Sequence, residues 1–122
     1  MINLKSHRPW LVIIYLIVMF SNSIFSFIYV PIENIWKYDK VIHFIEFFIL
    51  GVLLLYALYE NPISNKNLIS TLLVMSIIPI LDESIQFLSP HRVSSIYDAL
   101  ADYLGFYSGC SLYHFISRGN NG

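Results

Sequence analysis

Charged residues are scarce in this chain. Of its 122 residues only 12% are Asp, Glu, Lys or Arg, whereas 57% are hydrophobic and the mean hydropathy is +0.64. A water-soluble domain of this length needs far more charge to cover its surface, so the composition favours a membrane protein. The net charge of −1 excludes a broadly basic surface, and we therefore expect no nucleic-acid partner.

Cysteine and repeated sequence are scarce as well. Cys110 is the single cysteine, which excludes an intramolecular disulfide. The sequence has neither an internal repeat nor a low-complexity tract, and it leaves no room for a separate soluble domain. We therefore expect residues 1–122 to form one integral membrane domain.

Long apolar segments are what the sequence does contain. Crossing a bilayer as a helix takes roughly 20 mostly apolar residues, and four segments meet this length. We expect an all-α polytopic membrane protein, a four-transmembrane-helix bundle with short polar connections. Pro62 and Pro90 stand just past the second and third segments, where helices often stop. The expected helices cover residues 9–30, 41–59, 68–88 and 98–116.

The first segment has a second interpretation, as a cleaved secretory signal. Lys5 and Arg8 would form its basic region, residues 10–20 its apolar region, and the SNS triplet its cleavage site. We favour a retained helix because apolar residues resume at Ile24 and continue to Val30. Cleavage would leave the orientation of the other three helices unchanged.

The basic residues favour one orientation of such a bundle. Four alternating helices place both termini and the second loop on one side of the membrane, and the first and third loops on the other. The side with the termini holds four basic residues and the opposite side three. The positive-inside rule then favours cytoplasmic termini, with the acid-rich ends of the helices at the outer face.

Polar residues gather where three of the helices meet this outer face. The second helix begins with them, the third ends with them and the fourth begins with them, and their spacing of three or four residues places them on one stripe of each helix. Ionisable groups inside a membrane nearly always face the bundle interior or a wet cavity, so we expect a polar pocket here. The candidate ligand-binding residues are Asp39, His43, Glu46, Asp82, Glu83, Gln86, Arg92, Asp98 and Asp102.

Three smaller features bear on how the helices pack. Gly105 and Gly109 are four residues apart, a spacing that lets a neighbouring backbone approach closely, so we expect the fourth helix to bury this stripe. Pro79 lacks the N–H that would bond the carbonyl of Met75 and predicts a kink just below Asp82. A proline tolerated without consequence is an equal alternative.

Individually, these polar residues have simpler interpretations. Asp39 is well placed to cap the second helix, and Asp98 to cap the fourth. Asp82 and Glu83 are near enough to a helix end to extend into the interface, and Arg92 can serve as a structural partner for one of the acids. Chance explains poorly why all of them occur at one end of one bundle, so we favour the shared pocket.

Three segments resemble the VanZ-like family of small multi-pass membrane proteins. They read DKVIHFIEFFILG (39–51), DESIQFLSPHR (82–92) and SSIYDALADYLGFYSG (94–109). Their order and spacing match the family pattern Asp-Lys-x-x-His-Phe, Asp-Glu-x-x-Gln-x-Phe, an Arg after a Pro, and Asp-x-x-x-Asn-x-x-Gly-x-x-x-Gly. Asp102 replaces the Asn of this pattern, and His91 replaces a Gly before the arginine.

The resemblance implies a multi-pass protein of the bacterial cell envelope, located in the cytoplasmic membrane. The family takes its name from a member linked to low-level resistance to the glycopeptide teicoplanin, which makes antibiotic resistance a candidate role. The signature polar residues that the resemblance carries over are Asp39, Lys40, His43, Asp82, Glu83, Gln86, Arg92 and Asp98.

Two functions fit the expected pocket. We favour a binding protein that holds a membrane lipid, a lipid-linked cell-wall component or a membrane-protein partner. The alternative is a metal-dependent enzyme acting on a phosphate-containing lipid, in which His43, oriented by Asp39 or Glu46, would be the general base. Arg92 would clamp the phosphate. A divalent cation such as Mg²⁺ would bind Asp82, Glu83 and Asp98.

Overall fold

The computed structural model describes residues 6–25, 39–59, 64–88 and 96–121. Within these ranges every residue lies in a helix or in the turn beside one, which confirms the predicted all-α class for this part of the chain. The helices are α1 (Arg8–Phe25), α3 (Asp39–Leu58), α4 (Asn65–Met75), α5 (Ile77–Phe87) and α6 (Ile96–Asn121).

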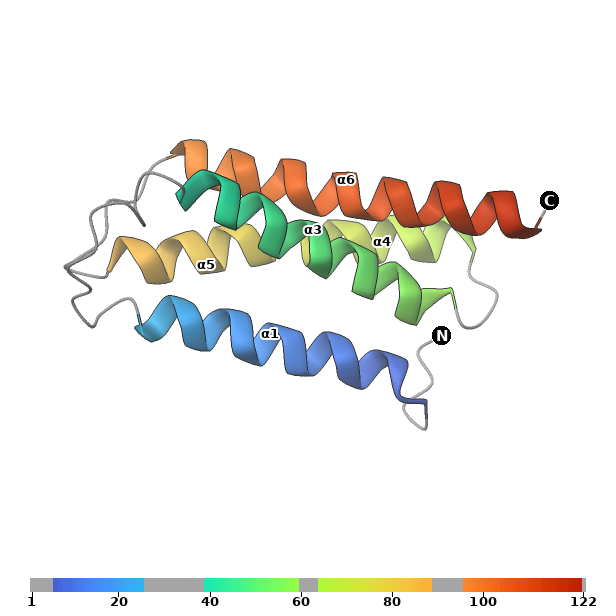
Figure 1. The fold of residues 1–122 in the computed structure, drawn as a ribbon, viewed down its shortest axis with the longest axis horizontal. Coiled ribbons are helices and arrows are strands. Elements are labelled where there is room, and N and C mark those ends of the chain that lie inside the picture. Colours follow the sequence, from blue (N-terminus) through green and yellow to red (C-terminus); the bar gives the residue numbers. More distant parts are fainter. Residues whose placement is uncertain (1–5, 26–38, 60–63, 89–95, 122) are drawn as a thin grey trace.

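The helices form a bundle in which the chain alternates in direction (Figure 1). α3 and α6 run parallel to each other and make the most extensive contact, while α1 and the α4–α5 pair run the opposite way. α1 lies against α3 and α5, and α5 also contacts α6. The largest fully buried apolar side chains come from α3 and α6; they are Phe47, Leu50, Leu55 and Phe106.

Glycine allows α3 and α6 to approach this closely. The position of a Cβ on Gly105 coincides with the backbone carbonyl of Phe44, and that on Gly109 with the carbonyl of Phe48. Gly51 lies in the same way against the backbone of α6. The close approach predicted from Gly105 and Gly109 is therefore confirmed, and the partner helix contributes a third glycine to it.

The helix expected over residues 68–88 is divided in two at Ser76. Both the N–H and the hydroxyl of Ser76 donate to the carbonyl of Leu72, at 3.0 and 2.8 Å. Pro79 has no N–H to offer the carbonyl of Met75, so the regular ladder of hydrogen bonds cannot pass this point. The helix is thus divided between α4 and α5 three residues before the proline, and the kink itself stays a prediction.

Helix boundaries also differ from those expected. α4 begins at Asn65 because the hydroxyl of Ser64 caps it. α6 covers Ile96–Asn121 rather than 98–116, since an apolar segment sets only the minimum length of a helix and the backbone bonds continue into polar sequence. Of the first expected helix, residues 26–30 lie outside the described ranges.

The exterior of the bundle is apolar. Two segments are long and apolar enough to cross a membrane, Val41–Leu58 and Asn65–Ile85, and Arg8–Ser21 is apolar but shorter. Large hydrophobic side chains face outward on Val41–Leu58 and on Asn65–Ile85; Leu73, for example, is 67% exposed. These features indicate a membrane protein.

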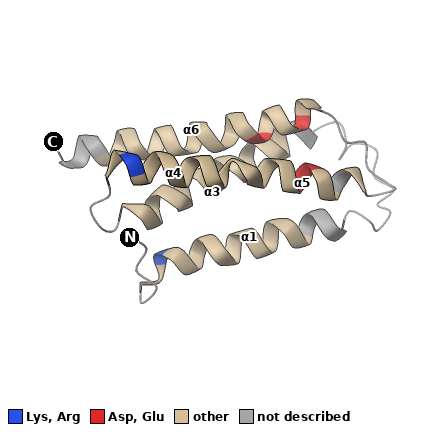
Figure 2. Cartoon of the chain, turned by 180° about the vertical axis from the view of Figure 1, so that it is seen from behind, with Lys and Arg blue, Asp and Glu red and all other residues tan. Residues whose placement is uncertain are grey.

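Charge is divided between the two ends of the bundle (Figure 2). Among the described side chains, the basic ones are Arg8 and Lys66, at the end where α1 begins and α3 ends. Arg8 donates to the carbonyl of Tyr56 at 3.1 Å, and its guanidinium lies over the Tyr56 ring at 4.1 Å. The described acidic side chains lie toward the opposite end; they are Glu46, Asp82, Glu83, Asp98 and Asp102.

Candidate functional site

Three buried ionisable side chains from three different helices meet near the acidic end of the bundle. Nδ1 of His43 on α3 lies 2.7 Å from Oδ1 of Asp102 on α6, and 3.9 Å from Oδ2 of Asp82 on α5. The exposed fraction is 1% for His43 and 0% for both aspartates. We call these three residues the buried cluster.

The packing of the helices explains how the buried cluster is held. His43 lies one turn before Phe47 on the face of α3 that meets α6. Asp102 lies one turn before Phe106 on the facing surface of α6, and Gly105 brings the two backbones together at this level. Asp82 comes from α5, one turn after Ile78, which is itself buried in the core.

Two further predicted acids flank the buried cluster. Asp98 lies one turn before Asp102 on the same face of α6 and is only 2% exposed. Glu83 follows Asp82 on α5 and is partly buried. The expectation that the two aspartates of α6 face the bundle interior is therefore met. The carboxylates of Asp82 and Glu83 also lie at this end of the bundle.

Glu46 lies apart from the buried cluster. It lines a cavity of about 230 Å³ between α1 and α3, together with Tyr15, Val18 and Met19. The Tyr15 hydroxyl donates to the backbone carbonyl of Glu46 at 2.6 Å. Glu46 thus lies on the side of α3 that meets α1, whereas His43 contacts Asp102 of α6, and the role of Glu46 in orienting His43 stays a prediction.

Four other predicted residues, Asp39, Lys40, Gln86 and Arg92, have side chains that the structure does not describe. Arg92 lies between the described ranges, and so does His91. Asp39, Lys40 and Gln86 belong to described helices, but their side chains are not described.

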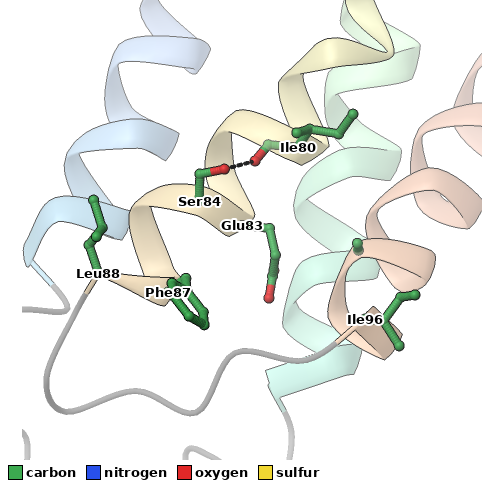
Figure 3. Close-up of a pocket in the computed structure, with 7 residues that line it drawn as sticks. Ile80, Glu83, Ser84, Phe87, Leu88 and Ile96 are labelled. Atoms are coloured by element: carbon green, nitrogen blue, oxygen red, sulfur yellow. Dashed lines mark hydrogen bonds between the residues drawn. The ribbon is translucent and has the colours of Figure 1, made fainter.

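A groove runs beside the buried cluster, between α5 and the start of α6. Its volume is about 600 Å³. Glu83 projects from α5 into this space, and the Ser84 hydroxyl donates to the carbonyl of Ile80 at 2.7 Å (Figure 3). The groove thus combines mainly apolar walls with one carboxylate. Its lining residues are Ile80, Glu83, Ser84, Phe87, Leu88, Ile96 and Ala99.

The arrangement offers hydrogen-bond acceptors and metal-ligand atoms rather than a nucleophile. Nδ1 of His43 and one carboxylate oxygen from each of Asp82 and Asp102 all lie within 4.8 Å of one another. Oδ2 of Asp102 is buried, and no described group forms a hydrogen bond with it. This set differs from the predicted metal ligands Asp82, Glu83 and Asp98, because the position of His43 depends on the contact between α3 and α6.

Two tyrosines near the site were not anticipated. The Tyr103 hydroxyl donates to the carbonyl of Ser76 at 2.8 Å, and the Tyr107 hydroxyl forms a hydrogen bond with the Ser76 hydroxyl. Both link α6 to the break between α4 and α5. Their spacing of four residues, with Tyr103 directly after Asp102, was a usable signal in the sequence.

The comparisons with known proteins agree with this architecture. The sequence model of the VanZ/LLP1 family matches residues 4–117, which includes every helix that contributes to the buried cluster. No curated protein and no solved structure matches the chain significantly. Because the match covers nearly the whole sequence, the chain belongs to the VanZ/LLP1 family.

Proposed function

We propose that this protein is a four-span component of the bacterial cytoplasmic membrane that binds an envelope lipid at the outer face. The observation that carries the proposal is a fully buried His–Asp cluster beside an apolar groove that contains a carboxylate. Buried ionisable groups are costly in a membrane protein, and they typically mark ligand or ion sites. The α5–α6 groove provides the adjacent apolar surface that a lipid chain requires.

The division of charge supports an orientation with cytoplasmic termini. The described basic side chains lie at the end where α1 begins, and basic residues are enriched on the cytoplasmic side of membrane proteins. Reporter fusions after Asn65 should therefore report a cytoplasmic position, and fusions within residues 89–95 an external one. Reports from the same side for both sites would contradict four spans.

The chemistry of the site indicates the class of lipid. Ionised carboxylates accept hydrogen bonds, so Glu83 and the nearby aspartates favour a head group rich in hydroxyl, amide or ammonium donors. The sugar and peptide parts of a lipid-linked cell-wall component have such donors. We therefore infer that this class of lipid occupies the α5–α6 groove, with its hydrocarbon chain along the apolar wall.

Native mass spectrometry of the full chain, extracted from bacterial membranes, tests the proposal. We expect a retained lipid mass in the wild-type protein and its loss in Ala99→Phe, because the added ring fills the groove. Leu104→Phe is the matched control, since Leu104 is 63% exposed on the same helix and lines a different groove. Retention of the lipid by Ala99→Phe would overturn the proposal. A bound protein mass instead of a lipid would indicate a membrane-protein partner.

Envelope function is the second measurement. Because of the family's link with teicoplanin, susceptibility to this glycopeptide should be compared in cells that express the wild-type, Ala99→Phe and Leu104→Phe proteins. We expect Ala99→Phe to behave like the empty vector and Leu104→Phe like the wild type. Equal susceptibility in all four strains would separate this protein from the resistance role while leaving lipid binding to the mass spectra.

A metal-dependent enzyme is the second candidate, supported by one observation. His43 forms a 2.7 Å contact with Asp102, an arrangement in which a carboxylate fixes the orientation of a histidine base. Such an enzyme would convert a phosphate-containing lipid, and His43→Gln would abolish turnover while the protein still inserted. Lipid recovered chemically unchanged after incubation with the wild-type protein would exclude this candidate.

A further inference from the structure

We propose that His43, Asp82 and Asp102 form a binding site for one divalent ion of the first transition row, zinc in the first instance. The ligand atoms would be Nδ1 of His43 and one carboxylate oxygen from each aspartate, which lie within 4.8 Å of one another. The inference rests on the geometry of the buried cluster and does not depend on whether the α5–α6 groove holds a lipid.

The distances are close to those of a tetrahedral site. Zinc bonds of roughly 2.0–2.2 Å to nitrogen and oxygen place neighbouring ligand atoms about 3.4 Å apart. Nδ1 of His43 lies 2.7 Å from Asp102 and 3.9 Å from Asp82, one value below and one above this spacing. Movements of well under 1 Å along these two directions would allow a metal to replace the direct contact between histidine and aspartate.

Oδ2 of Asp102 is a second and independent observation. This atom is buried in a side chain with 0% exposure, and within the described part of the chain it has no hydrogen-bond partner. An unsatisfied buried carboxylate oxygen is costly, and each such atom in a folded protein requires an explanation. A bound cation or its water ligand would satisfy it.

Charge leads to the same conclusion. The buried ionisable side chains described at this end are three aspartates and one histidine. A protonated histidine balances one carboxylate, whereas a divalent ion with a neutral imidazole balances two. Buried charges are tolerated when they are paired or coordinate a metal. A metal would therefore lower the cost of keeping Asp102 ionised away from water.

The donor atoms favour zinc over magnesium or calcium. One imidazole nitrogen with two carboxylates is a mixed nitrogen and oxygen set, whereas Mg²⁺ and Ca²⁺ prefer six or more oxygen ligands. Three protein ligands also leave a fourth position for water or for a ligand group. Cys110 is not part of the set, because its thiol contacts the carbonyl of Gly51 at 3.7 Å.

Metal analysis of the purified full chain in nanodiscs tests the inference. The protein is stripped with a chelator, equilibrated with Zn²⁺ and desalted, and the metal per chain is measured by mass spectrometry. We expect close to one zinc per wild-type chain and at least a tenfold weaker zinc affinity in Asp102→Asn and in His43→Gln, since a lost ligand costs no less than a lost supporting contact (about 10–100-fold). Zinc should also raise the melting temperature of the wild type but not that of Asp102→Asn.

Two controls distinguish this site from adventitious binding. Asp98→Asn removes an equally buried carboxylate one turn away on the same helix, and His114→Gln removes an exposed histidine; both variants should keep the zinc. Cobalt in place of zinc should give the visible absorption of a tetrahedral site in the wild type and in Asp98→Asn. Asp102→Asn should lack this absorption. Substoichiometric zinc in the wild type, or an equal loss in Asp98→Asn and Asp102→Asn, would overturn the proposal.

Discussion

α6 and α4 belong to the same bundle, but they meet their surroundings in opposite ways. α6 buries a stripe that includes Asp98, Asp102, Gly105, Phe106, Gly109 and Cys110. In α4 no residue is buried, although the segment Asn65–Ile85 has a mean hydropathy of 1.8. Apart from Phe106, the stripe buried by α6 is made of small and polar residues, whereas α4 exposes large aliphatic side chains such as Leu73 and Val74.

The contrast teaches what drives contact between such helices. Lipid chains are as apolar as leucine, so an aliphatic surface gains little by leaving lipid for another helix. Glycine allows dense backbone packing, and a buried carboxylate requires a partner. The helix contacts of this protein therefore follow its glycines and aspartates, and these same residues build the candidate site.

Removing His43 should have the largest effect on stability at the contact between α3 and α6. His43→Leu leaves Asp102 buried without its partner, which should lower the free energy of unfolding by about 3–5 kcal/mol. The measurement is equilibrium unfolding in mixed detergent micelles, with Ile45→Leu, on the exposed side of α3, as the control. A stability equal to that of the control would mean that the α3–α6 contact does not depend on its polar pair.

Adding a side chain at Gly105 should cause the next largest loss of stability. Gly105→Ala places a methyl group on the carbonyl of Phe44, and backbone cannot move aside as a flexible side chain can. We expect a loss of about 3 kcal/mol, the upper part of the range for overpacking. Ser108→Ala changes an exposed position of the same helix and should be neutral in the same unfolding assay. Wild-type stability of Gly105→Ala would show that the two helices are not held this closely.

A matched pair of leucines measures the difference between the two regions directly. Leu54 on α3 is 4% exposed and Leu73 on α4 is 67% exposed. Leu54→Ala should cost about 2 kcal/mol, the low end for a buried leucine because the surroundings outside the bundle are also apolar, and Leu73→Ala less than about 0.5 kcal/mol. Thermal unfolding of both variants gives the comparison. Equal losses would mean that α4 is covered by something beyond this chain.

The smallest expected effect concerns the link between the two regions. Tyr103→Phe removes the hydrogen bond to the carbonyl of Ser76 and should lower stability by about 1 kcal/mol. Hydrogen exchange should also become faster around Ser76, because the break between α4 and α5 loses a contact with α6. Tyr97→Phe, at an exposed position near the start of α6, is the control. Unchanged exchange at Ser76 would contradict a role for Tyr103 in holding α4.

The sequence allowed prediction of those features that depend on one segment at a time. The length of the apolar segments predicted the helices, and the spacing of Gly105 and Gly109 predicted the close approach of α6 to a neighbouring helix. Pro79 indicated an interruption near the place where α4 ends and α5 begins. Features that depend on the rotation of one helix against another were not predictable. The clearest case is His43, because nothing in its own segment indicates its contact with Asp102 on a distant segment.

The same reasoning explains the two tyrosines and the metal-ligand set. Tyr103 was not among the predicted site residues, because nothing in its own segment indicates the carbonyl that it meets across the bundle. Asp82 was grouped with Glu83 and Asp98 by residue type, whereas helix packing places it beside His43. Local pattern therefore identified most members of the site, and their partners came only from the structure.

The parallel pairing of α3 with α6 also has a consequence for biosynthesis. The ribosome completes α3 first and α6 only after α4 and α5, so His43 leaves the ribosome before Asp102 exists to meet it. A nascent chain that stalls before residue 96 lacks both the acid that contacts this histidine and the two glycines of α6 that allow its close contact with α3. Such a chain would expose an unmatched polar face to proteases, and the docking of α6 is the step that completes the site and removes that signal for degradation.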